Sequence, residues 1–376
     1  MSSLLSPEDK RYSFKCEWFD PAAEINRPYI LSYFIRDGTV EIYDVKNHRM
    51  FLKRCAAGDI SVGDLFLGSS VVVFSRQFKL IDFADESTKE SLQASKQRCC
   101  MLIKPEAYDK VGQILDRIYK AGLYVAQMRT FRLSKQEYQE FFHQYEMHPQ
   151  FSELIQRLHN DLVIGLDVVG DRCIRVLWSI CGEENPVEAR RKSPESLRAE
   201  YGIDWVQNAI YVSNGIESAM EELNYLFNRP HPSTAILTNC TLCVILPHMI
   251  HQGKGGEILS AIIDEGFDIS AMELFHLDKG SAFEWLQVYQ QVWPEFTSKI
   301  DEFCTGPCIA IELRGENVFS EFRKFCGPYD PAVAKHIEPN SLRAKYGTNR
   351  VHNAVHCTDL PDDTELECEY FFQTLQ

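Results

Sequence analysis

The chain has 376 residues, of which 45% are hydrophobic and 25% are charged, which is ordinary usage for a globular protein. This composition argues against a largely disordered or fibrous chain, and no apolar stretch approaches the ~18 residues that a membrane helix needs. A net charge of −15 disfavours nonspecific binding to nucleic acid or anionic lipid, because such binding needs clustered cations. We therefore expect a soluble protein of about two to four domains that binds neither nucleic acid nor membranes.

The cysteines and the first residues bear on the cellular compartment. Residues 1–15 contain no apolar core of signal-peptide length, so we expect a chain that is not secreted. Thirteen cysteines in such a chain indicate free thiols in a reducing compartment. Cys240 and Cys243 have the spacing of a redox or zinc pair, but positions i and i+3 of a strand face opposite sides, and no second pair completes a tetrahedral site. We therefore expect buried structural thiols there and no metal site.

Residues 12–85 have the pattern of an all-β domain, with short runs of aromatic and β-branched residues. The expected strands are residues 12–19, 29–36, 39–43, 71–74 and 78–83. Asp37 and Gly38 lie between two of these runs and predict a two-residue hairpin loop, because such a loop needs positive φ. Val40 and Ile42 recur at every second position, as in a half-buried strand.

Residues 84–97 are polar and show no apolar periodicity, so we expect a linker with a domain boundary near residue 93. Within the preceding domain, residues 46–49 and 53–54 form the one notable basic cluster. This cluster is either the solvated edge of a hairpin or a contact for an acidic surface such as tubulin. The acidic segment 359–369 near the other end of the chain is likewise either a solvated face or a partner contact.

An internal repeat organises the rest of the chain. The matching segments are 99–105 with 240–247, 181–186 with 326–331, 194–202 with 339–347, and 208–211 with 353–356. The offset is 142 residues at the start and 145 at the end, which indicates two consecutive modules of about 140 residues. The predicted domains are therefore 1–93, 94–230 and 238–376, with a short junction near residues 228–238.

Each repeated module alternates strands with helices. In the first, an apolar strand at 100–103 precedes an amphipathic helix at 113–119, which Gly122 ends as a C-cap glycine. Two further strands are expected at 123–132 and 162–169, and a final strand at 208–211 leads into a terminal helix at 217–227. This order predicts a βαββαβ core in an α+β protein, with an antiparallel sheet backed by helices.

The two modules resemble nucleoside diphosphate kinases over roughly residues 97–228 and 238–374. The resemblance rests on three segments: residues 103–105, residues 339–343 and the Asn-x-x-His element at 353–356. It implies that each module has the ferredoxin-like fold. The N-terminal part, through residues 17–21 and 43–49, resembles a DM-ten domain, which implies a small all-β domain of PH-like fold.

One such domain before two kinase modules resembles the ciliary branch of this kinase family. That resemblance implies a protein of the cilium or flagellum axoneme, on the luminal wall of doublet microtubules. The implied partners are tubulin and other doublet-microtubule inner proteins.

The resemblance also implies a specific chemistry. A working module passes a γ-phosphate through a phosphohistidine whose imidazole must be neutral and oriented by a glutamate. The transferring phosphoryl group must be surrounded by positive charge, because its catalysis is mostly positioning and electrostatics. The family supplies a lysine after the first strand, two arginines, a threonine, and Mg²⁺ carried by the nucleotide. If this chain binds a cofactor, we expect it to be Mg-ATP or Mg-GTP.

In the second module, the resemblance places His356 at the nucleophile and Glu367 at the orienting carboxylate. The matched nucleotide-binding positions are Arg323, Arg343 and Asn353. Leu246 replaces the phosphate lysine and Tyr329 replaces the threonine, so this module is incomplete.

In the first module, the nucleophile is replaced by Tyr211. The matched positions that survive are Lys104, Arg198, Asn208 and Glu222, whereas Trp178 replaces an arginine and Glu184 replaces the threonine. We expect this module to be inactive, because a phenol with a pKa near ~10 is a poor nucleophile at neutral pH.

Three functions stay open on the sequence alone. The first is a structural, microtubule-associated role in which the modules supply folds rather than turnover. The second is a weak or residual nucleoside diphosphate kinase that acts through His356. The third is a nucleotide sensor that binds without phosphotransfer.

Overall fold

The computed structural model describes residues 10–376, except residues 21, 22, 24, 57–59, 61, 68, 75, 94, 95 and 160. The chain divides into two compact units: a first unit of residues up to 96 together with 276–307, and a second unit of residues 97–275 together with 308–376. Within the described residues, no helix is both long and apolar enough to cross a bilayer.

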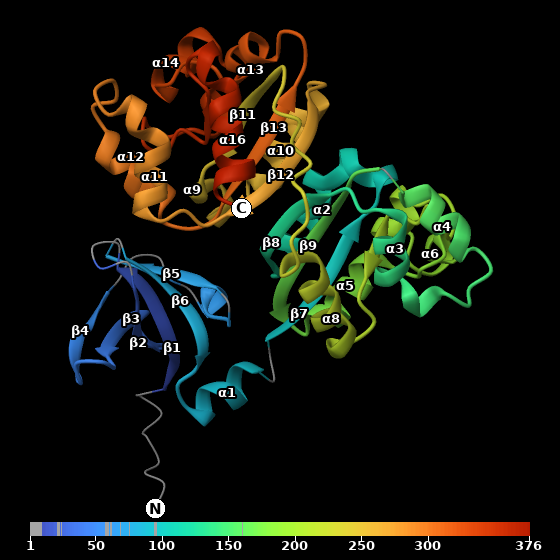
Figure 1. The fold of residues 1–376 in the computed structure, drawn as a ribbon, viewed down its shortest axis with the longest axis horizontal. Helices are drawn as coiled ribbons and strands as arrows, with labels where there is room; N and C mark the ends of the chain where they lie inside the picture. The colour runs from blue at the N-terminus through green and yellow to red at the C-terminus, as the bar shows by residue number, and fades with distance from the viewer. Residues whose placement is uncertain are drawn as a thin grey trace, which may run out of the picture. The chain divides into compact units, whose positions relative to one another are not determined.

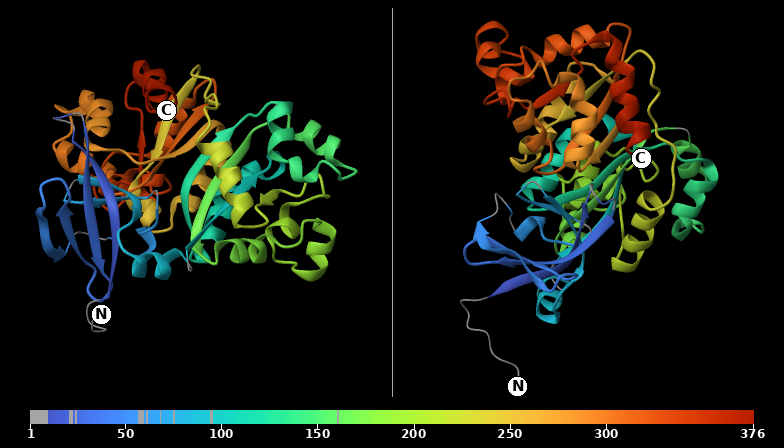
Figure 2. Two further views of the ribbon diagram at one scale, coloured as in Figure 1. Left: turned by 60° about the horizontal axis from the view of Figure 1, so that its bottom comes forward. Right: turned by 60° about the vertical axis from the view of Figure 1, so that its left-hand side comes forward.

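The first unit contains a six-stranded antiparallel sheet with the order β4-β3-β2-β1-β6-β5 (Figure 1). Figure 2 shows the same strands from two further directions. The strands are β1 (Arg11–Asp20), β2 (Ile25–Phe34), β3 (Thr39–Asp44), β4 (Arg49–Ala56), β5 (Ser70–Val73) and β6 (Arg76–Phe83). The all-β prediction for this domain is confirmed. The sequence prediction missed β4, because this edge strand carries charged residues in place of an apolar pattern.

The predicted hairpin at Asp37 and Gly38 is present, but its loop is longer than expected. Phe34 pairs with Thr39, so four residues connect β2 to β3 instead of two. Gly38 has a φ of 66°, the left-handed conformation that glycine adopts without strain. The alternation predicted in the next strand is confirmed, since Val40 and Ile42 are fully buried.

The prediction of a linker over residues 84–97 is wrong, because helix α1 (Glu86–Gln93) lies there and strand β7 begins at Lys96. The helix is polar, but Leu92 is buried in the core of the β domain. The hydroxyl of Thr88 accepts a hydrogen bond from the backbone amide of Ser13 at 2.9 Å. The buried Leu92 and the hydrogen bond from Ser13 to Thr88 thus help to dock a helix that is mostly polar.

The first unit also includes a pair of helices from the second half of the chain, α11 (Lys279–Leu286) and α12 (Phe296–Phe303). Lys279 pairs with Asp301 at 2.6 Å, and the rings of Trp285 and Phe303 meet edge to face at 5.0 Å between centroids. These contacts hold the two helices together as a hairpin.

The second unit is built on one eight-stranded sheet with the order β10-β7-β9-β8-β12-β13-β11-β14. The first four strands are β7 (Lys96–Ile103), β8 (Tyr124–Phe131), β9 (Val163–Asp171) and β10 (Ile210–Val212). The other four are β11 (Cys240–Ile245), β12 (Asp268–Phe275), β13 (Cys308–Arg314) and β14 (Val355–Cys357). When each half is read from the outer edge of the sheet toward its middle, the order is fourth, first, third and second strand of the module. This order confirms the predicted ferredoxin-like βαββαβ modules.

Helices of both modules complete the second unit. In the first module they are η3 (Pro105–Lys110), α2 (Val111–Lys120), α3 (Lys135–Phe141), α4 (Phe151–Leu158), α5 (Cys173–Cys181), α6 (Pro186–Lys192), α7 (Leu197–Tyr201) and α8 (Ile216–Phe227). In the second they are α9 (Pro247–His251), α10 (Gly255–Asp264), α13 (Val318–Cys326), α14 (Pro331–Ile337), α15 (Leu342–Tyr346), α16 (Thr364–Glu369) and η7 (Tyr370–Thr374). The predicted C-cap glycine, Gly122, has a φ of 75° and follows α2 as expected.

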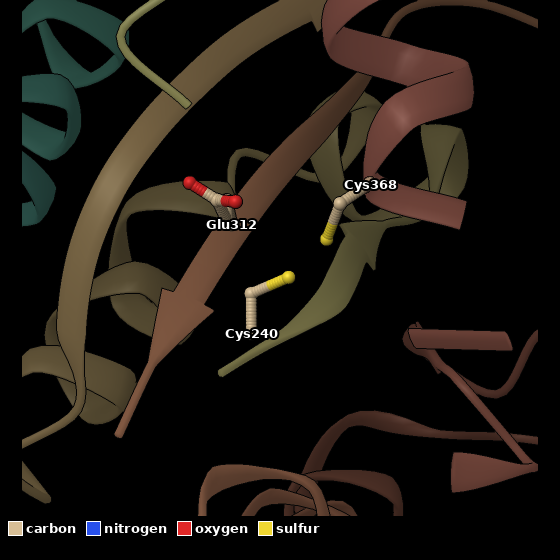
Figure 3. Close-up of side chains that lie close together, drawn as sticks. All are labelled: Cys240, Glu312 and Cys368. Atoms are coloured by element: carbon tan, nitrogen blue, oxygen red, sulfur yellow. The ribbon is translucent and has the colours of Figure 1, made fainter. Parts of the chain in front are cut away.

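The cysteines of β11 lie on the two faces of the sheet, and all thirteen cysteines of the chain are free thiols. Cys243 belongs to the hydrophobic core on the side of α2 and α10. Cys240 lies on the other face, close to Cys368 of α16 and Glu312 of β13 (Figure 3).

The two modules join edge to edge and helix to helix. Glu273 of β12 pairs with Arg129 of β8 in antiparallel register, and their side chains form an ion pair at 3.3 Å. Gly112 of α2 faces Gly256 of α10, and a Cβ on Gly112 would overlap the Gly256 carbonyl oxygen and lie 2.7 Å from the amide nitrogen of Ser260. These glycines occupy matched positions of the repeat, and they let the two helix backbones approach closely.

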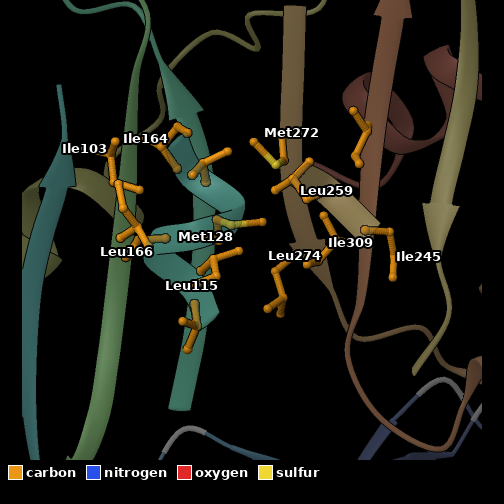
Figure 4. Close-up of a cluster of buried hydrophobic side chains, with 14 of the residues drawn as sticks. Ile103, Leu115, Met128, Ile164, Leu166, Ile245, Leu259, Met272, Leu274 and Ile309 are labelled. Atoms are coloured by element: carbon orange, nitrogen blue, oxygen red, sulfur yellow. The ribbon is translucent and has the colours of Figure 1, made fainter. Parts of the chain in front are cut away.

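One hydrophobic core, which includes residues of α2 and α10, runs through both modules (Figure 4). Leu115 and Met128 come from the first module, and Leu259 and Met272 come from the second. All four side chains are at most 1% exposed. The modules therefore share this core within one compact unit.

Candidate functional site

His356 and Glu367, the predicted catalytic pair, lie in contact in the second module. His356 is buried in β14, and its Nε2 lies 2.9 Å from Oε2 of Glu367 on α16. Because an ionised carboxylate only accepts hydrogen bonds, this contact places the imidazole proton on Nε2. A ring with this tautomer has its lone pair on Nδ1, which is the nitrogen that would attack a phosphoryl group.

A third residue of this arrangement, Thr358, was missed in the sequence analysis. Its hydroxyl donates to the same Oε2 of Glu367 at 2.9 Å. In the first module, Ser213 donates in the same way to Oε2 of Glu222 at 2.6 Å. The repeat itself carried the signal, since a hydroxyl residue follows the nucleophile position by two residues in both modules.

The two predicted arginines of the second module donate to acceptors of the protein itself. Arg343 is buried, and its guanidinium donates to the carbonyls of Gly327 at 2.9 Å and Val355 at 3.2 Å. Arg323 donates to the carbonyl of Thr358 at 3.0 Å and forms an ion pair with Asp359. Asp359, the first residue of the acidic segment 359–369, offsets a positive charge that a phosphate would need.

At the other matched positions of the second module, the side chains are buried or half-buried and contact the protein itself. Leu246, at the place of the phosphate lysine, is fully buried before α9. Asn353 is also buried and donates to the carbonyl of Tyr329 at 3.3 Å. The guanidinium of Arg343 lies 5.9 Å from the centre of the Tyr329 ring, so this ring covers the arginine at the place of the threonine. These residues do not fit the triphosphate of a Mg-nucleotide as well as the expected set would.

In the first module, a tyrosine and its aromatic neighbours fill the nucleophile position. Tyr211 donates to Oε1 of Glu222 at 2.6 Å and accepts from Gln144 at 2.5 Å. The rings of Phe141 and Phe142 lie edge to face with it at 5.7 and 5.2 Å. Burial, reinforced by the charge of Glu222, raises the pKa of Tyr211 far above its ordinary value. This phenol therefore stays protonated and bonded, and it cannot act as a nucleophile at neutral pH.

The lysine that survives in the first module is also engaged. Lys104 is 3% exposed, and its Nζ donates to the carbonyl of Val206 at 3.1 Å. Burial lowers the pKa of Lys104 to about 8. Asn208 donates to the carbonyl of Glu184 at 3.1 Å.

The buried Arg198 repeats the arrangement of its counterpart Arg343. It donates to the carbonyls of Gly182 at 2.6 Å and Ile210 at 2.9 Å. Trp178, which replaces the other arginine, donates its indole N–H to the carbonyl of Ser213 at 3.0 Å. The positions that were expected to bind nucleotide in this module thus stabilise the loops around β10.

Comparison with known proteins identifies the family of the modules and of the N-terminal domain. The family model described as "Nucleoside diphosphate kinase" matches residues 97–231 and again 239–376, and "Nucleoside diphosphate kinase 7 N-terminal PH domain" matches residues 6–94. "Nucleoside diphosphate kinase homolog 7" of Rattus norvegicus is 42% identical over 100% of this chain and 96% of its own length. The protein of the same name from Mus musculus is 41% identical over 100% of this chain and 97% of its own.

A shorter relative, "Nucleoside diphosphate kinase" of Aquifex aeolicus, is 33% identical over 36% of this chain and 95% of its own length. One module of the present chain therefore corresponds to nearly a whole protein of that kind. The matched domain is described as a PH domain, so the DM-ten assignment stays a prediction. With a PH-like domain followed by two matching modules, the chain belongs to the nucleoside diphosphate kinase family.

Proposed function

We propose that this protein is a structural component of the ciliary axoneme, bound inside doublet microtubules to tubulin and other inner proteins. In this role the kinase modules supply folded surfaces, and phosphotransfer is absent or residual. The proposal rests on the order of the domains and on two sites that keep their fold while losing groups that the chemistry needs.

The observation that carries the proposal is that a packed tyrosine occupies the nucleophile position of the first module. Tyr211 replaces the histidine and bonds to Glu222, the carboxylate that would orient it. Phe141 and Phe142 pack against the phenol ring. A site under selection for turnover would keep a nucleophilic nitrogen here, whereas a site kept for its fold needs only a well-packed core.

Electrostatics bears on how the protein would bind a microtubule. A chain with a net charge of −15 meets an acidic tubulin surface, so long-range attraction does not favour the complex. Binding would then depend on shape and apolar contact, and it should survive raised salt. If mild detergent releases the protein from isolated cilia as a soluble matrix component, the structural role is wrong.

The second candidate function is a weak nucleoside diphosphate kinase, and the hydrogen bond between His356 and Glu367 favours it. Leu246 opposes it, because one missing transition-state contact costs about 10²–10³ in rate. Acid-labile labelling by γ-labelled ATP separates the two functions. High labelling that disappears in His356→Ala and persists in His336→Ala, an exposed histidine on α14, would establish the kinase. Affinity for Mg-nucleotide without labelling would support a nucleotide sensor.

The location is tested separately from the chemistry. Electron microscopy of axonemes in situ should place density for the two modules on the luminal wall of doublet microtubules. Density on the outer wall, or none, would contradict the proposed location whatever the labelling result.

A further inference from the structure

One buried carboxylate position has different neighbours in the two modules. Asp167 of β9 and Glu312 of β13 occupy matched positions of the repeat, and both are fully buried. In the first module, Arg98 of β7 pairs with Asp167, with Nε 3.2 Å from Oδ1. A buried carboxylate there has a cation beside it, as the cost of burying an unpaired charge requires.

In the second module, thiols replace that cation. With the offset of 142 residues that relates Lys104 to Leu246, Cys240 stands at the position of Arg98. With the offset of 145 near the end of the repeat, Cys368 of α16 stands at the position of Leu223. Among the ion pairs of the described residues, none involves Glu312. The second module thus has two cysteines where the first has an arginine and a leucine, and it keeps a carboxylate beside them. Two thiols and a carboxylate are typical ligands of a metal ion.

The three groups lie close together although they come from separate segments of the chain. The two Sγ atoms and a carboxylate oxygen of Glu312 all lie within 4.8 Å of one another, and all three residues are buried (Figure 3). Zn–S bonds of ~2.3 Å and Zn–O bonds of ~2.0 Å in a tetrahedral site separate the ligand atoms by about 3.5–3.8 Å. Small side-chain rotations therefore suffice to bring the three atoms onto one ion.

Glu312 is already held in a fixed orientation. Its Oε2 accepts from the amide of Ile236 at 2.8 Å, and its Oε1 accepts from the amide of Leu237 at 2.7 Å. The hydroxyl of Ser270 donates to Oε2 as well. Such outer hydrogen bonds orient a carboxylate ligand, and they leave a lone pair on Oε1 for an ion.

We propose that Cys240, Glu312 and Cys368 bind a thiophilic divalent cation such as Zn²⁺, in the place that the guanidinium of Arg98 takes in the first module. Cys240 also lines a pocket of about 320 Å³ together with Asn239 and Thr364. An ion would reach the site from the side of Cys240 through this pocket, which would also supply water as a fourth ligand.

Binding balances as an exchange of protons for the ion. The two thiols release their protons to solvent, and the divalent ion binds two thiolates and one carboxylate, which leaves a net charge of −1. The amide and hydroxyl donors around Glu312 stabilise this residual charge. The ion would tie α16 to β11 and β13, and α16 also carries Glu367, the partner of His356. The site would thus fix the residue that orients the histidine.

The test is a Co²⁺ titration of the reduced, metal-free full chain followed by absorption spectroscopy. One equivalent should produce thiolate-to-cobalt charge-transfer bands and the visible bands of a tetrahedral site, and Zn²⁺ should displace it. Cys240→Ser and Cys368→Ser should each weaken or abolish the bands, whereas Cys55→Ser, which removes a partly exposed thiol, should leave them unchanged. Ser270→Ala should weaken Co²⁺ affinity about 10–100-fold.

The double variant Cys240→Arg with Cys368→Leu copies the first module and guards against a trivial loss of folding. It should melt close to the wild-type temperature and show no cobalt bands. Bands of full strength in this variant would overturn the proposal. So would a wild-type chain that takes up no cobalt while its thiols are reduced, or a Cys240–Cys368 disulfide found by peptide mapping of protein prepared with a thiol reductant.

Discussion

Tyr211 donates its hydroxyl to Glu222 across 2.6 Å, in the same relation that histidine and glutamate hold in the second module. The carboxylate has been kept while its partner has changed from an imidazole to a phenol. Burial raises the pKa of Glu222 above its ordinary value, although the hydrogen bonds from Ser213 and Tyr211 act in the opposite direction. Conservation of this glutamate within the repeat therefore reflects a buried hydrogen-bond network and does not require catalysis.

Restoring the histidine alone should not restore the first site. We expect Tyr211→His, made in a chain that also carries His356→Ala, to give no acid-labile phosphorylation from γ-labelled ATP. The reason is that Trp178 and Glu184 still replace the arginine and the threonine of the site. The parent chain with His356→Ala is the control, and stoichiometric label in the double variant would refute the expectation.

The second site should respond to the return of its missing groups. Leu246→Lys with Tyr329→Thr should raise phosphotransfer from ATP to a diphosphate acceptor by at least ~10-fold, about 1.4 kcal/mol. The first module shows that the fold accepts a lysine at this position, since Lys104 is buried there with a backbone carbonyl as its partner.

The matched control for this revertant adds His356→Ala, which should remove the whole gain. Activity that survives this change would mean another nucleophile and would sink the mechanism. No gain at all would mean that the two substitutions do not reopen the phosphate site.

The buried lysine gives a pH dependence with a definite sign. The pKa of Lys104 falls from 10.5 to about 8 on folding, so between these values the unfolded chain binds more protons than the folded one. Its contribution to the free energy of unfolding should therefore rise with pH, by about 2 kcal/mol from pH 7 to 9.5. Urea unfolding of wild type and of Lys104→Met at both pH values measures this contribution, as the difference between their free energies of unfolding. If that difference does not change with pH, the lysine is not buried as described.

The glycine contact between α2 and α10 predicts that a Gly→Ala substitution in a helix, which usually stabilises a protein, will destabilise this one. Replacing a helical glycine by alanine usually stabilises by about 1 kcal/mol, but Gly112→Ala places a methyl group against the backbone of Gly256. We expect it to lower the free energy of unfolding by about 1–3 kcal/mol, the usual cost of overpacking. The control is Gly315→Ala, whose added Cβ would lie no closer than 3.5 Å to its neighbours. Equal urea midpoints for Gly112→Ala and wild type would contradict this view of the contact.

The repeat made much of the fold predictable, because two copies of one strand and helix order constrain each other. Elements without a local pattern were missed. Helix α1 depends on the hydrogen bond between Thr88 and Ser13, residues far apart in the sequence. Edge strand β4 is too charged to show an alternating pattern.

The sequence predicted which positions form the candidate site, but it did not predict all the contacts that these residues make. The sequence placed His356, Glu367 and both arginines of the second module, and the histidine and glutamate are indeed in contact. It could not indicate that Asp359 pairs with Arg323, since an acidic residue near the end of a strand has no pattern of its own. Nor could it bring Cys368 to Cys240, because only the packing of α16 on the sheet joins them.

The core that runs through both modules links their evolutionary fates. If the two modules folded separately, deletion of one would leave the core of the other intact. Here, removal of either half would expose Leu115 and Met128, or Leu259 and Met272, to water. Purifying selection on packing can therefore preserve the first module whether or not its site transfers phosphate.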